Sequence, residues 1–229
     1  MLKFHSFDSA DAQAEALARA VGAALEQVLS TRAASQRATL AVSGGKSPVA
    51  FCVHLSRLPI AWSRIDITLV DDRWVESSDA DSNARFVHEH LLQNAAAEAR
   101  FLPLVDTSAS AADVIDRLNA ASSSPALPDV AVLGMGEDGH TASIFADAPE
   151  WEEAITSSKR FLIVHPASAP HARISWSMHA LKQMGVLFLQ IGGEKKRAVL
   201  EAATAEAQRN AISQLALDGG VTLNAYWFA

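Results

Sequence analysis

The N-terminal part of the chain has apolar residues at helical spacing, and short apolar runs recur along the rest of it. The apolar positions of the first segment share one helical face: Leu17, Val21, Ala24, Leu25 and Val28. Asp8 and Ser9 precede this segment, and either side chain can cap a helix N-terminus. The pattern therefore predicts a long first helix that begins just after these two residues.

The rest of the chain alternates between strand-like and helix-like patterns. Short runs of apolar and β-branched residues predict strands at 39–42, 65–70, 129–133, 161–164, 186–191 and 221–227. Helices are predicted after Pro48, which suits a first helical turn, and at 83–97, 111–121 and 194–203. The polar, proline-containing stretch 122–128 is expected to be a surface loop.

Strands that alternate with helices predict an α/β fold in which helices cover a mostly parallel sheet. The sequence shows no internal repeat and no convincing linker, so we expect one domain over residues 1–229. In such sheets, ligands bind beyond the carboxyl ends of the strands. Three predicted strand ends carry polar, charged or glycine-rich turns, at 43–47, 71–73 and 134–140. Their convergence at one edge of the sheet predicts a functional site there.

Composition narrows the classes of protein to consider. The chain has 229 residues, 49% hydrophobic and 20% charged, which suits a globular domain with its own core. Its formal net charge of -7 argues against a nucleic-acid partner and against binding to a membrane surface. The single cysteine, Cys52, excludes an intrachain disulfide and a thiolate-rich zinc site, and it indicates a reducing compartment. The start lacks a signal-peptide-like run and no stretch approaches the roughly 20 apolar residues of a membrane span, so we expect a cytoplasmic protein.

The first turn, 43–47, reads Ser-Gly-Gly-Lys-Ser between a predicted strand and a predicted helix. Ser43, Gly44 and Gly45 are candidates for phosphate binding, because glycines let a ligand oxygen approach backbone N–H groups. The alternative is a tight turn without a ligand. We reject nucleotide binding by a P-loop, since the first glycine of that motif would fall at Leu40, inside the strand.

The third turn matches a dinucleotide-binding fingerprint in its glycines, Gly134, Gly136 and Gly139, which follow a predicted strand. A dinucleotide site needs a long helix that opens from the glycines, and Pro149 comes too soon for one. Two carboxylates within the turn would also face a pyrophosphate. We therefore interpret the segment as a loop and predict no nucleotide cofactor.

His140 ends this turn and is the candidate general base. An unperturbed imidazole titrates near pH ~6.5, so much of it is neutral and able to take a proton at cellular pH. Asp138 can orient the ring and stabilise its protonated form. The alternative is a structural histidine that caps the short turn 141–143, but the glycines at a strand end favour a catalytic interpretation.

The remaining candidates are charged residues whose spacing alone decides nothing. Arg73, after Asp71 and Asp72, either belongs to a solvated turn with an internal ion pair or faces an anionic or carbonyl group. Arg173 and Lys196 are either surface residues or parts of a phosphate clamp, as a fork and a point charge respectively. The other histidines show no ligand spacing, so no catalytic metal is predicted.

Taken together, these segments resemble the glucosamine-6-phosphate isomerase/6-phosphogluconolactonase superfamily, and within it the 6-phosphogluconolactonases, nearly from end to end. The strongest anchors are Ser-Gly-Gly at 43–45, Asp-Asp-Arg-Trp at 71–74, and Gly-Met-Gly-Glu-Asp-Gly-His-Thr-Ala-Ser at 134–143. The last of these is nearly diagnostic. Weaker anchors are Arg-Ile-Ser at 173–175 and the region around Lys196.

The resemblance implies a Rossmann-like, mostly parallel sheet sandwiched by helices, of the NagB/RpiA/CoA transferase-like kind. It implies hydrolysis of 6-phospho-D-glucono-1,5-lactone to 6-phosphogluconate in the oxidative pentose phosphate pathway, without a cofactor, by a monomer or homodimer. His140 would activate water, with Asp138 and Arg73 as the other catalytic residues. The substrate phosphate would contact Ser43, Gly44, Gly45, Arg173 and Lys196, and the residues expected near the substrate are Asp71, Asp72 and Gly136.

The sequence departs from the family pattern at two places, and both departures are small. Asp72 stands where the family often has glutamate, and Phe-Ala-Asp at 145–147 replaces a common Phe-Pro-Gly.

The sister activity, an amino-sugar-phosphate isomerase/deaminase, would call for Asp-Glu-Tyr at 71–73 and an Asn-Glu-Pro-like run after the histidine. A non-catalytic sugar-phosphate sensor of the same fold would need an attached DNA-binding module, and the sequence has no basic helix-turn-helix segment.

Overall fold

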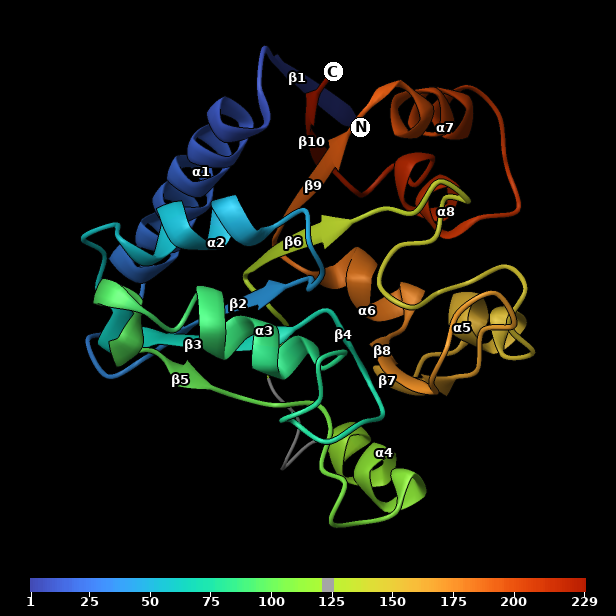
Figure 1. Ribbon diagram of the computed structural model, residues 1–229, viewed down its shortest axis with the longest axis horizontal. Coiled ribbons are helices and arrows are strands. Elements are labelled where there is room, and N and C mark those ends of the chain that lie inside the picture. Colours follow the sequence, from blue (N-terminus) through green and yellow to red (C-terminus); the bar gives the residue numbers. More distant parts are fainter. Residues whose placement is uncertain (121–125) are drawn as a thin grey trace.

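The computed structural model describes residues 1–120 and 126–229, and within them the strands form two sheets (Figure 1). The larger sheet is parallel throughout and has the order β1-β10-β9-β6-β2-β3-β5. Its strands are β1 (Leu2–Phe7), β2 (Ala38–Val42), β3 (Ile65–Leu69), β5 (Arg100–Phe101), β6 (Val130–Gly134), β9 (Val186–Gly192) and β10 (Leu223–Phe228). The smaller sheet is antiparallel and consists of β4 (Asp71–Arg73), β8 (Arg173–Trp176) and β7 (Phe161–Val164).

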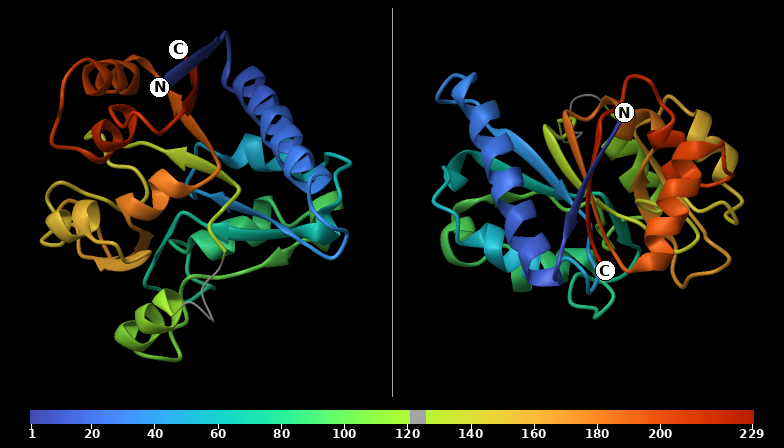
Figure 2. Two further views of the ribbon diagram at one scale, coloured as in Figure 1. Left: turned by 180° about the vertical axis from the view of Figure 1, so that it is seen from behind. Right: turned by 90° about the horizontal axis from the view of Figure 1, so that it is seen from above.

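Helices lie on both sides of the larger sheet, as the view from above shows (Figure 2). The helices of the first half are α1 (Ala10–Ser30), α2 (Val49–Ser56), α3 (Asn83–His90) and α4 (Ala111–Asn119). Those of the second half are α5 (Trp151–Thr156), α6 (Met178–Gln183), α7 (Glu194–Ala205) and α8 (Ala211–Ala216). In Figure 2, α1 lies on one side of the sheet and α7 on the other. The predicted α/β fold with a mostly parallel sheet between helices is therefore confirmed.

The core explains why these segments form these elements. Every residue of β2 and β3 is buried, as expected for parallel strands that are covered by helices on both faces. The predicted apolar stripe of helix α1 faces the core: Leu17, Val21 and Leu25 are fully buried, and Ala24 and Val28 are partly buried against it. Of the two capping candidates, Ser9 is the one whose side chain accepts a hydrogen bond from the Ala12 N–H.

Several predicted boundaries are wrong. The helix expected at 83–97 ends at His90, and Asn94, with φ of 49°, begins a separate short 3-10 helix at Asn94–Glu98. Asparagine tolerates this left-handed backbone, and its side chain donates to Ser56 Oγ at 3.0 Å, which favours the break. Helix α4 ends at Asn119, and the last strand begins at Leu223. The loop expected at 122–128 lies partly outside the described residues.

The order of strands defines where a ligand can bind. From β2 the chain continues to β3 and β5 on one side, and then returns to β6 on the other side of β2. Such a reversal leaves a crevice between the carboxyl ends of the two strands where it occurs. The loops that follow these ends, after Val42 and after Gly134, are the two glycine-rich segments singled out from the sequence. No helix in the described part of the chain is long and apolar enough to cross a bilayer.

Candidate active site

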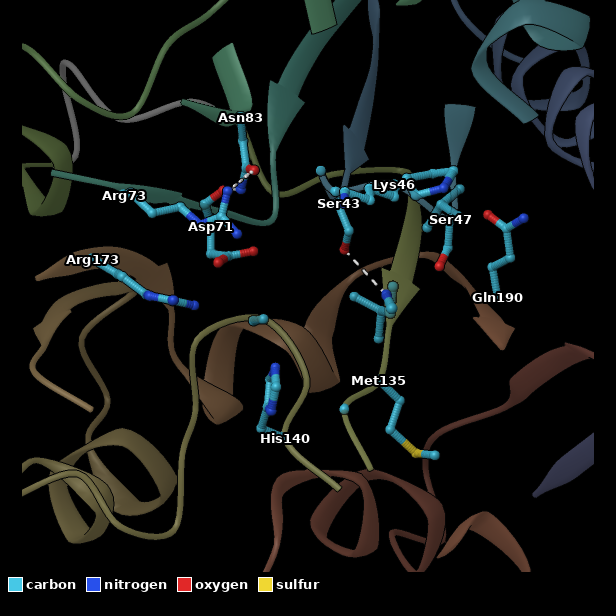
Figure 3. A pocket seen from close by; sticks show the side chains of 18 of the residues that line it. Ser43, Lys46, Ser47, Asp71, Arg73, Asn83, Met135, His140, Arg173 and Gln190 are labelled. Carbon is cyan, nitrogen blue, oxygen red and sulfur yellow. Dashed lines mark hydrogen bonds between the residues drawn. The ribbon is translucent and has the colours of Figure 1, made fainter. Parts of the chain in front are cut away.

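A cavity of about 250 Å³ lies at this crevice, beyond the carboxyl ends of β2, β6 and β9 (Figure 3). It gathers most of the candidates from the sequence: Ser43, Gly44, Gly45, Asp71, Arg73, Gly136, His140, Arg173 and Lys196. Two candidates do not line it, Asp72 and Asp138. Asp138 instead lines an adjoining, more open depression, which shares Gly136, His140 and the two arginines with the cavity.

The loop that carries His140 is held closed by its own backbone. The Gly136 N–H donates to the His140 carbonyl at 2.9 Å, and the Gly139 N–H donates to the Gly136 carbonyl at 3.1 Å. Gly139 has φ of 79°, a left-handed conformation that favours glycine. The Thr141 hydroxyl donates a hydrogen bond to the Gly134 carbonyl at 2.7 Å. These contacts fix the loop to the end of β6.

The imidazole of His140 is held on three sides. Its Nδ1 lies 2.6 Å from Asp138 Oδ1, and its ring stacks on Phe145 with 3.9 Å between centroids. Gly136 lies on the third side. The hydrogen bond to His140 holds the pKa of Asp138 below its usual range, so this carboxylate accepts the proton on Nδ1. The other ring nitrogen, Nε2, is then the one that can take a proton.

The loop after β2 is joined to the loop after β6 and to α3. The Gly134 N–H donates to Ser43 Oγ at 3.1 Å, so the hydroxyl proton of Ser43 remains free to donate elsewhere. A Cβ on Gly44 would lie 2.1 Å from Asn83 Oδ1, which requires glycine at this position. Gly45 has φ of 104°, again in the left-handed region.

The acidic pair at 71–72 lies in β4 and does not form the solvated turn considered from the sequence. Asp71 accepts a hydrogen bond from the Ser143 hydroxyl at 2.5 Å. Asp72 is fully buried and accepts the backbone N–H groups of Asn83 at 2.7 Å and Ala84 at 3.2 Å, so it secures the start of α3. Burial, with Asp71 nearby, raises the pKa of Asp72 to about 6, although these N–H groups oppose the rise.

Arg73 and Arg173 face each other across the antiparallel pair of β4 and β8, and Figure 3 shows them on the same side of the cavity. Arg73 Nη1 donates to the Asp81 carbonyl at 2.7 Å and to Asn83 Oδ1 at 2.9 Å. Arg173 Nη2 donates to the Pro170 carbonyl at 3.4 Å. The Nε atoms of both arginines are buried and have no hydrogen-bond partner among the described residues. Burial lowers the pKa of Arg173, Arg73 adds to this effect, and Asp71 and Asp81 oppose it.

Lys196 lies in the first turn of α7 and reaches the same cavity. Lys46 and Gln190 lie on the side away from the arginines (Figure 3). The cavity therefore has cationic groups from separate parts of the chain around one imidazole, which suits an anionic ligand with a second, reactive group.

Two polar cavity residues lie outside the segments singled out from the sequence. Asn83 holds Arg73 and also donates from Nδ2 to the Asp71 carbonyl at 2.8 Å. Gln190, at the end of β9, donates from Nε2 to Gln13 Oε1 at 3.1 Å. The only signal for Gln190 is a polar residue within the apolar run 186–191, and Asn83 carries no signal apart from its place at a helix start.

Over residues 1–120 and 126–229, no group of three or more His, Cys, Asp or Glu side chains could hold a metal ion. The cavity offers imidazole, guanidinium, ammonium and backbone groups to a ligand.

Comparisons with known proteins show which family this chain is similar to. The sequence model of the family described as glucosamine-6-phosphate isomerases/6-phosphogluconolactonase matches residues 8–222. A 6-phosphogluconolactonase of Neisseria meningitidis is 39% identical, covering 99% of each chain. A 6-phosphogluconolactonase of Pseudomonas aeruginosa is 42% identical over 86% of this chain and 83% of its own.

Solved structures give the same result. A 6-phosphogluconolactonase from Shewanella baltica has a TM-score of 0.91 at 34% identity, covering 100% of this chain and 98% of that chain. A monomeric glucosamine-6-phosphate deaminase has a TM-score of 0.73 at 16% identity, covering 97% and 96% of the two chains, and this likeness concerns the fold alone.

Proposed function

The chain belongs to the glucosamine-6-phosphate isomerase/6-phosphogluconolactonase family, and we propose that it is a 6-phosphogluconolactonase. It hydrolyses 6-phospho-D-glucono-1,5-lactone to 6-phospho-D-gluconate, a step of the oxidative pentose phosphate pathway. The observation that carries this proposal is one cavity in which an imidazole held by a carboxylate meets several cationic side chains, among them Arg73, Arg173 and Lys196.

In this proposal the phosphate of the substrate binds to the loop at 43–45, to Arg173 and to Lys196. The Ser43 hydroxyl has a free proton to donate, and Gly44 and Gly45 leave backbone N–H groups open to a ligand oxygen. The buried Nε of Arg173 is a further donor that gains a partner only when something binds or moves. The lining of a single cavity by all five residues supports this assignment.

His140 acts as the general base. With Nδ1 bonded to Asp138, Nε2 takes a proton from water as the water oxygen bonds to the lactone carbonyl carbon. Asp138 stabilises the imidazolium that forms. The tetrahedral intermediate then collapses, the bond from this carbon to the ring oxygen breaks, and Nε2 returns its proton to that oxygen. The product is an open-chain acid with a new hydroxyl group, and no covalent enzyme intermediate is needed.

Arg73 stabilises the negative charge that develops on the carbonyl oxygen. Its guanidinium is held at Nη1 by the Asp81 carbonyl and by Asn83, so it need not reorganise during the reaction. Asp71 and Gly136 lie close to the substrate in this scheme, since both line the cavity. Asp72 acts through the backbone that it fixes at the start of α3.

Two other functions fit the site less well. An amino-sugar-phosphate isomerase/deaminase would be expected to carry a tyrosine where this chain places Arg73. A sugar-phosphate sensor has no use for an imidazole whose Nδ1 is bonded to a carboxylate beside the ligand cavity.

The test uses freshly prepared 6-phosphogluconolactone and follows acid release at constant pH. We expect a rate well above spontaneous hydrolysis, and a much lower rate with glucono-1,5-lactone, which lacks the phosphate. Thermal stabilisation by the lactone without accelerated acid release would contradict the lactonase and favour the sensor.

We further propose that residues 1–229 act as a single domain in the cytoplasm, as a monomer or homodimer, and bind no nucleic acid. The net charge of -7 supports the absence of a nucleic-acid partner. The sole cysteine of the sequence, Cys52, is buried and free, which suits a reducing compartment.

A further inference from the structure

The two cavity arginines depend on two loops that leave β4 and β8 side by side. The last contact of this strand pair joins the Trp74 N–H to the Ala172 carbonyl at 2.7 Å. Beyond it, the chain after β4 forms the loop 75–82, and the chain before β8 forms the loop 165–172. Each loop supplies a backbone carbonyl that holds one arginine, from Asp81 for Arg73 and from Pro170 for Arg173.

One side-chain contact joins these loops. His171 Nε2 lies 3.1 Å from Asp81 Oδ2, and the two side chains are 34% and 59% exposed. His171 also has φ of 68°, a left-handed backbone that is unfavourable for a residue with a Cβ. Such a conformation persists only where the surrounding contacts impose it. The contact with Asp81 is one that can do so.

The arginines need such a restraint. Like charges directly opposite each other in a β-pair repel, and here they are Arg73 and Arg173. Asp81 counters this repulsion in two ways, because its carbonyl accepts from Arg73 and its carboxylate favours the charged form of Arg173. The contact of Arg173 with the Pro170 carbonyl is long, at 3.4 Å, so the position of this side chain depends on where the loop 165–172 is held.

We propose that His171 and Asp81 are a pair of positioning residues, which lock the two loops together and so set the spacing of Arg73 and Arg173 for the anionic substrate. This inference rests on the proposed function, in which both arginines contact the substrate. We expect the pair to affect the position of Arg173, and so the binding of the phosphate, more than the position of Arg73. Arg73 has a second support that is independent of the loops, from Asn83 Oδ1.

The test compares steady-state kinetics with 6-phosphogluconolactone for H171A, D81A and the double variant H171A/D81A. D81A keeps the backbone carbonyl that holds Arg73, so it reports on the carboxylate alone. We expect each single variant to raise KM roughly threefold to tenfold, with kcat changed less than about twofold. The double variant should match D81A, which loses both the contact with His171 and the direct support of Arg173. The dissociation constant of 6-phosphogluconate, measured by calorimetry, should rise by the same factor as KM.

Two further variants control for general effects. H54A removes another exposed histidine–aspartate contact, His54 with Asp11 at 2.9 Å, which joins α1 and α2 away from the cavity. H54A should leave both constants unchanged. H171Q should keep KM within about twofold of the unaltered chain, because a glutamine amide reaches about as far as Nε2 of the imidazole and can donate to Asp81. D81A provides the test if H171A does not fold, because it breaks the same contact from the other loop.

The outcomes separate this inference from the function on which it rests. No accelerated hydrolysis by the unaltered chain would overturn both. Normal turnover by the unaltered chain, with KM unchanged in H171A and D81A, would overturn the positioning role alone. So would single effects that multiply in the double variant, since the two residues would then act independently.

Discussion

The imidazole of His140 lies so close to Gly136 that no side chain fits between them. A Cβ at position 136 would stand 2.3 Å from His140 Nδ1, 2.4 Å from Cε1 and 2.3 Å from Asp138 Oδ1. Gly136 does not share the left-handed backbone of Gly139, so this clash alone decides the effect of a substitution. G136A should therefore displace the ring and its carboxylate together, and we expect kcat to fall by about 10²-fold or more.

The control for G136A is G219A, at a glycine where an added Cβ would meet nothing within 4 Å. G219A should keep the kcat of the unaltered chain, measured with the same lactone assay. If G136A kept a normal kcat while remaining folded, the imidazole would not need its present position, and His140 would lose its role as the base.

The contact between Asp138 and His140 predicts that turnover falls when the carboxylate is removed. The pKa of Asp138 lies below its usual range, so above about pH 5 this carboxylate is ionised and contributes fully to orienting the ring. D138N should lower kcat by about 10- to 10²-fold, less than for a fully buried triad because the Asp138 side chain is 53% exposed. Steady-state kinetics with the same lactone, at one fixed pH above about 5, measure this loss. A kcat within threefold of normal would contradict the proposed role of Asp138.

Because the Asp72 carboxyl group is buried, we expect the fold to lose stability as the pH rises. Burial raises its pKa from an ordinary value of 3.8 to about 6, so the folded chain binds this proton more tightly than the unfolded chain does. Stability from Asp72 is therefore fully present below pH 3.8 and is lost as the pH rises through about 6. The loss is on the order of 3 kcal/mol. The free energy of unfolding of the unaltered chain, minus that of D72N, should fall across this range in denaturant titrations.

Asp66 supplies a control of opposite sign for D72N. Burial acts against it, but hydrogen bonds from Arg100 and Arg37 hold the pKa of Asp66 below its usual range. The free energy of unfolding of the unaltered chain, minus that of D66N, should rise with pH as Asp66 ionises. A carboxyl group whose pKa is lower in the folded chain than in the unfolded chain stabilises the fold at pH values above its pKa in the unfolded chain. A difference for D72N that is flat, or that rises with pH, would show that Asp72 is not buried as a costly charge.

The parts of the site that the sequence predicts are those set by local pattern and by parallel strands. Apolar runs that end in polar turns predict strand ends, and a parallel sheet brings such ends to one edge. This reasoning brings the loops at 43–45 and 134–140 together. Asp138 and His140 are two residues apart, so their contact follows from a single tight turn.

What the sequence does not predict depends on pairings between distant segments. β4 and β8 are short and carry charged residues, and the sequence did not predict either as a strand. Their register nevertheless places Arg73 opposite Arg173. Asn83 gains its role only because Asp72 fixes the start of α3 beside Gly44 and Arg73. The break after His90 depends on a contact of Asn94 with Ser56 in another part of the chain.

The position of Arg173 leads us to expect that this residue favours substrate binding but lowers the stability of the fold. It opposes Arg73 in the strand pair, its Nε has no hydrogen-bond partner in the part of the chain that the structure describes, and burial lowers its pKa. R173M removes the charge but keeps an apolar stem over the Phe145 ring, whose centroid lies 5.1 Å from the guanidinium carbon. Without ligand, we expect R173M to raise the free energy of unfolding by about 0.5–1 kcal/mol.

The same substitution should weaken substrate binding. Loss of charged hydrogen bonds to the phosphate should raise KM by about 10- to 10²-fold. Added 6-phosphogluconate should then stabilise the unaltered chain more than R173M, and at high concentration it should reverse their order of stability, because only the state that binds the ligand gains from it. Denaturant titrations with and without 6-phosphogluconate measure both effects. A less stable R173M without ligand would mean that Arg173 supports the fold, and an unchanged KM would remove it from the phosphate site.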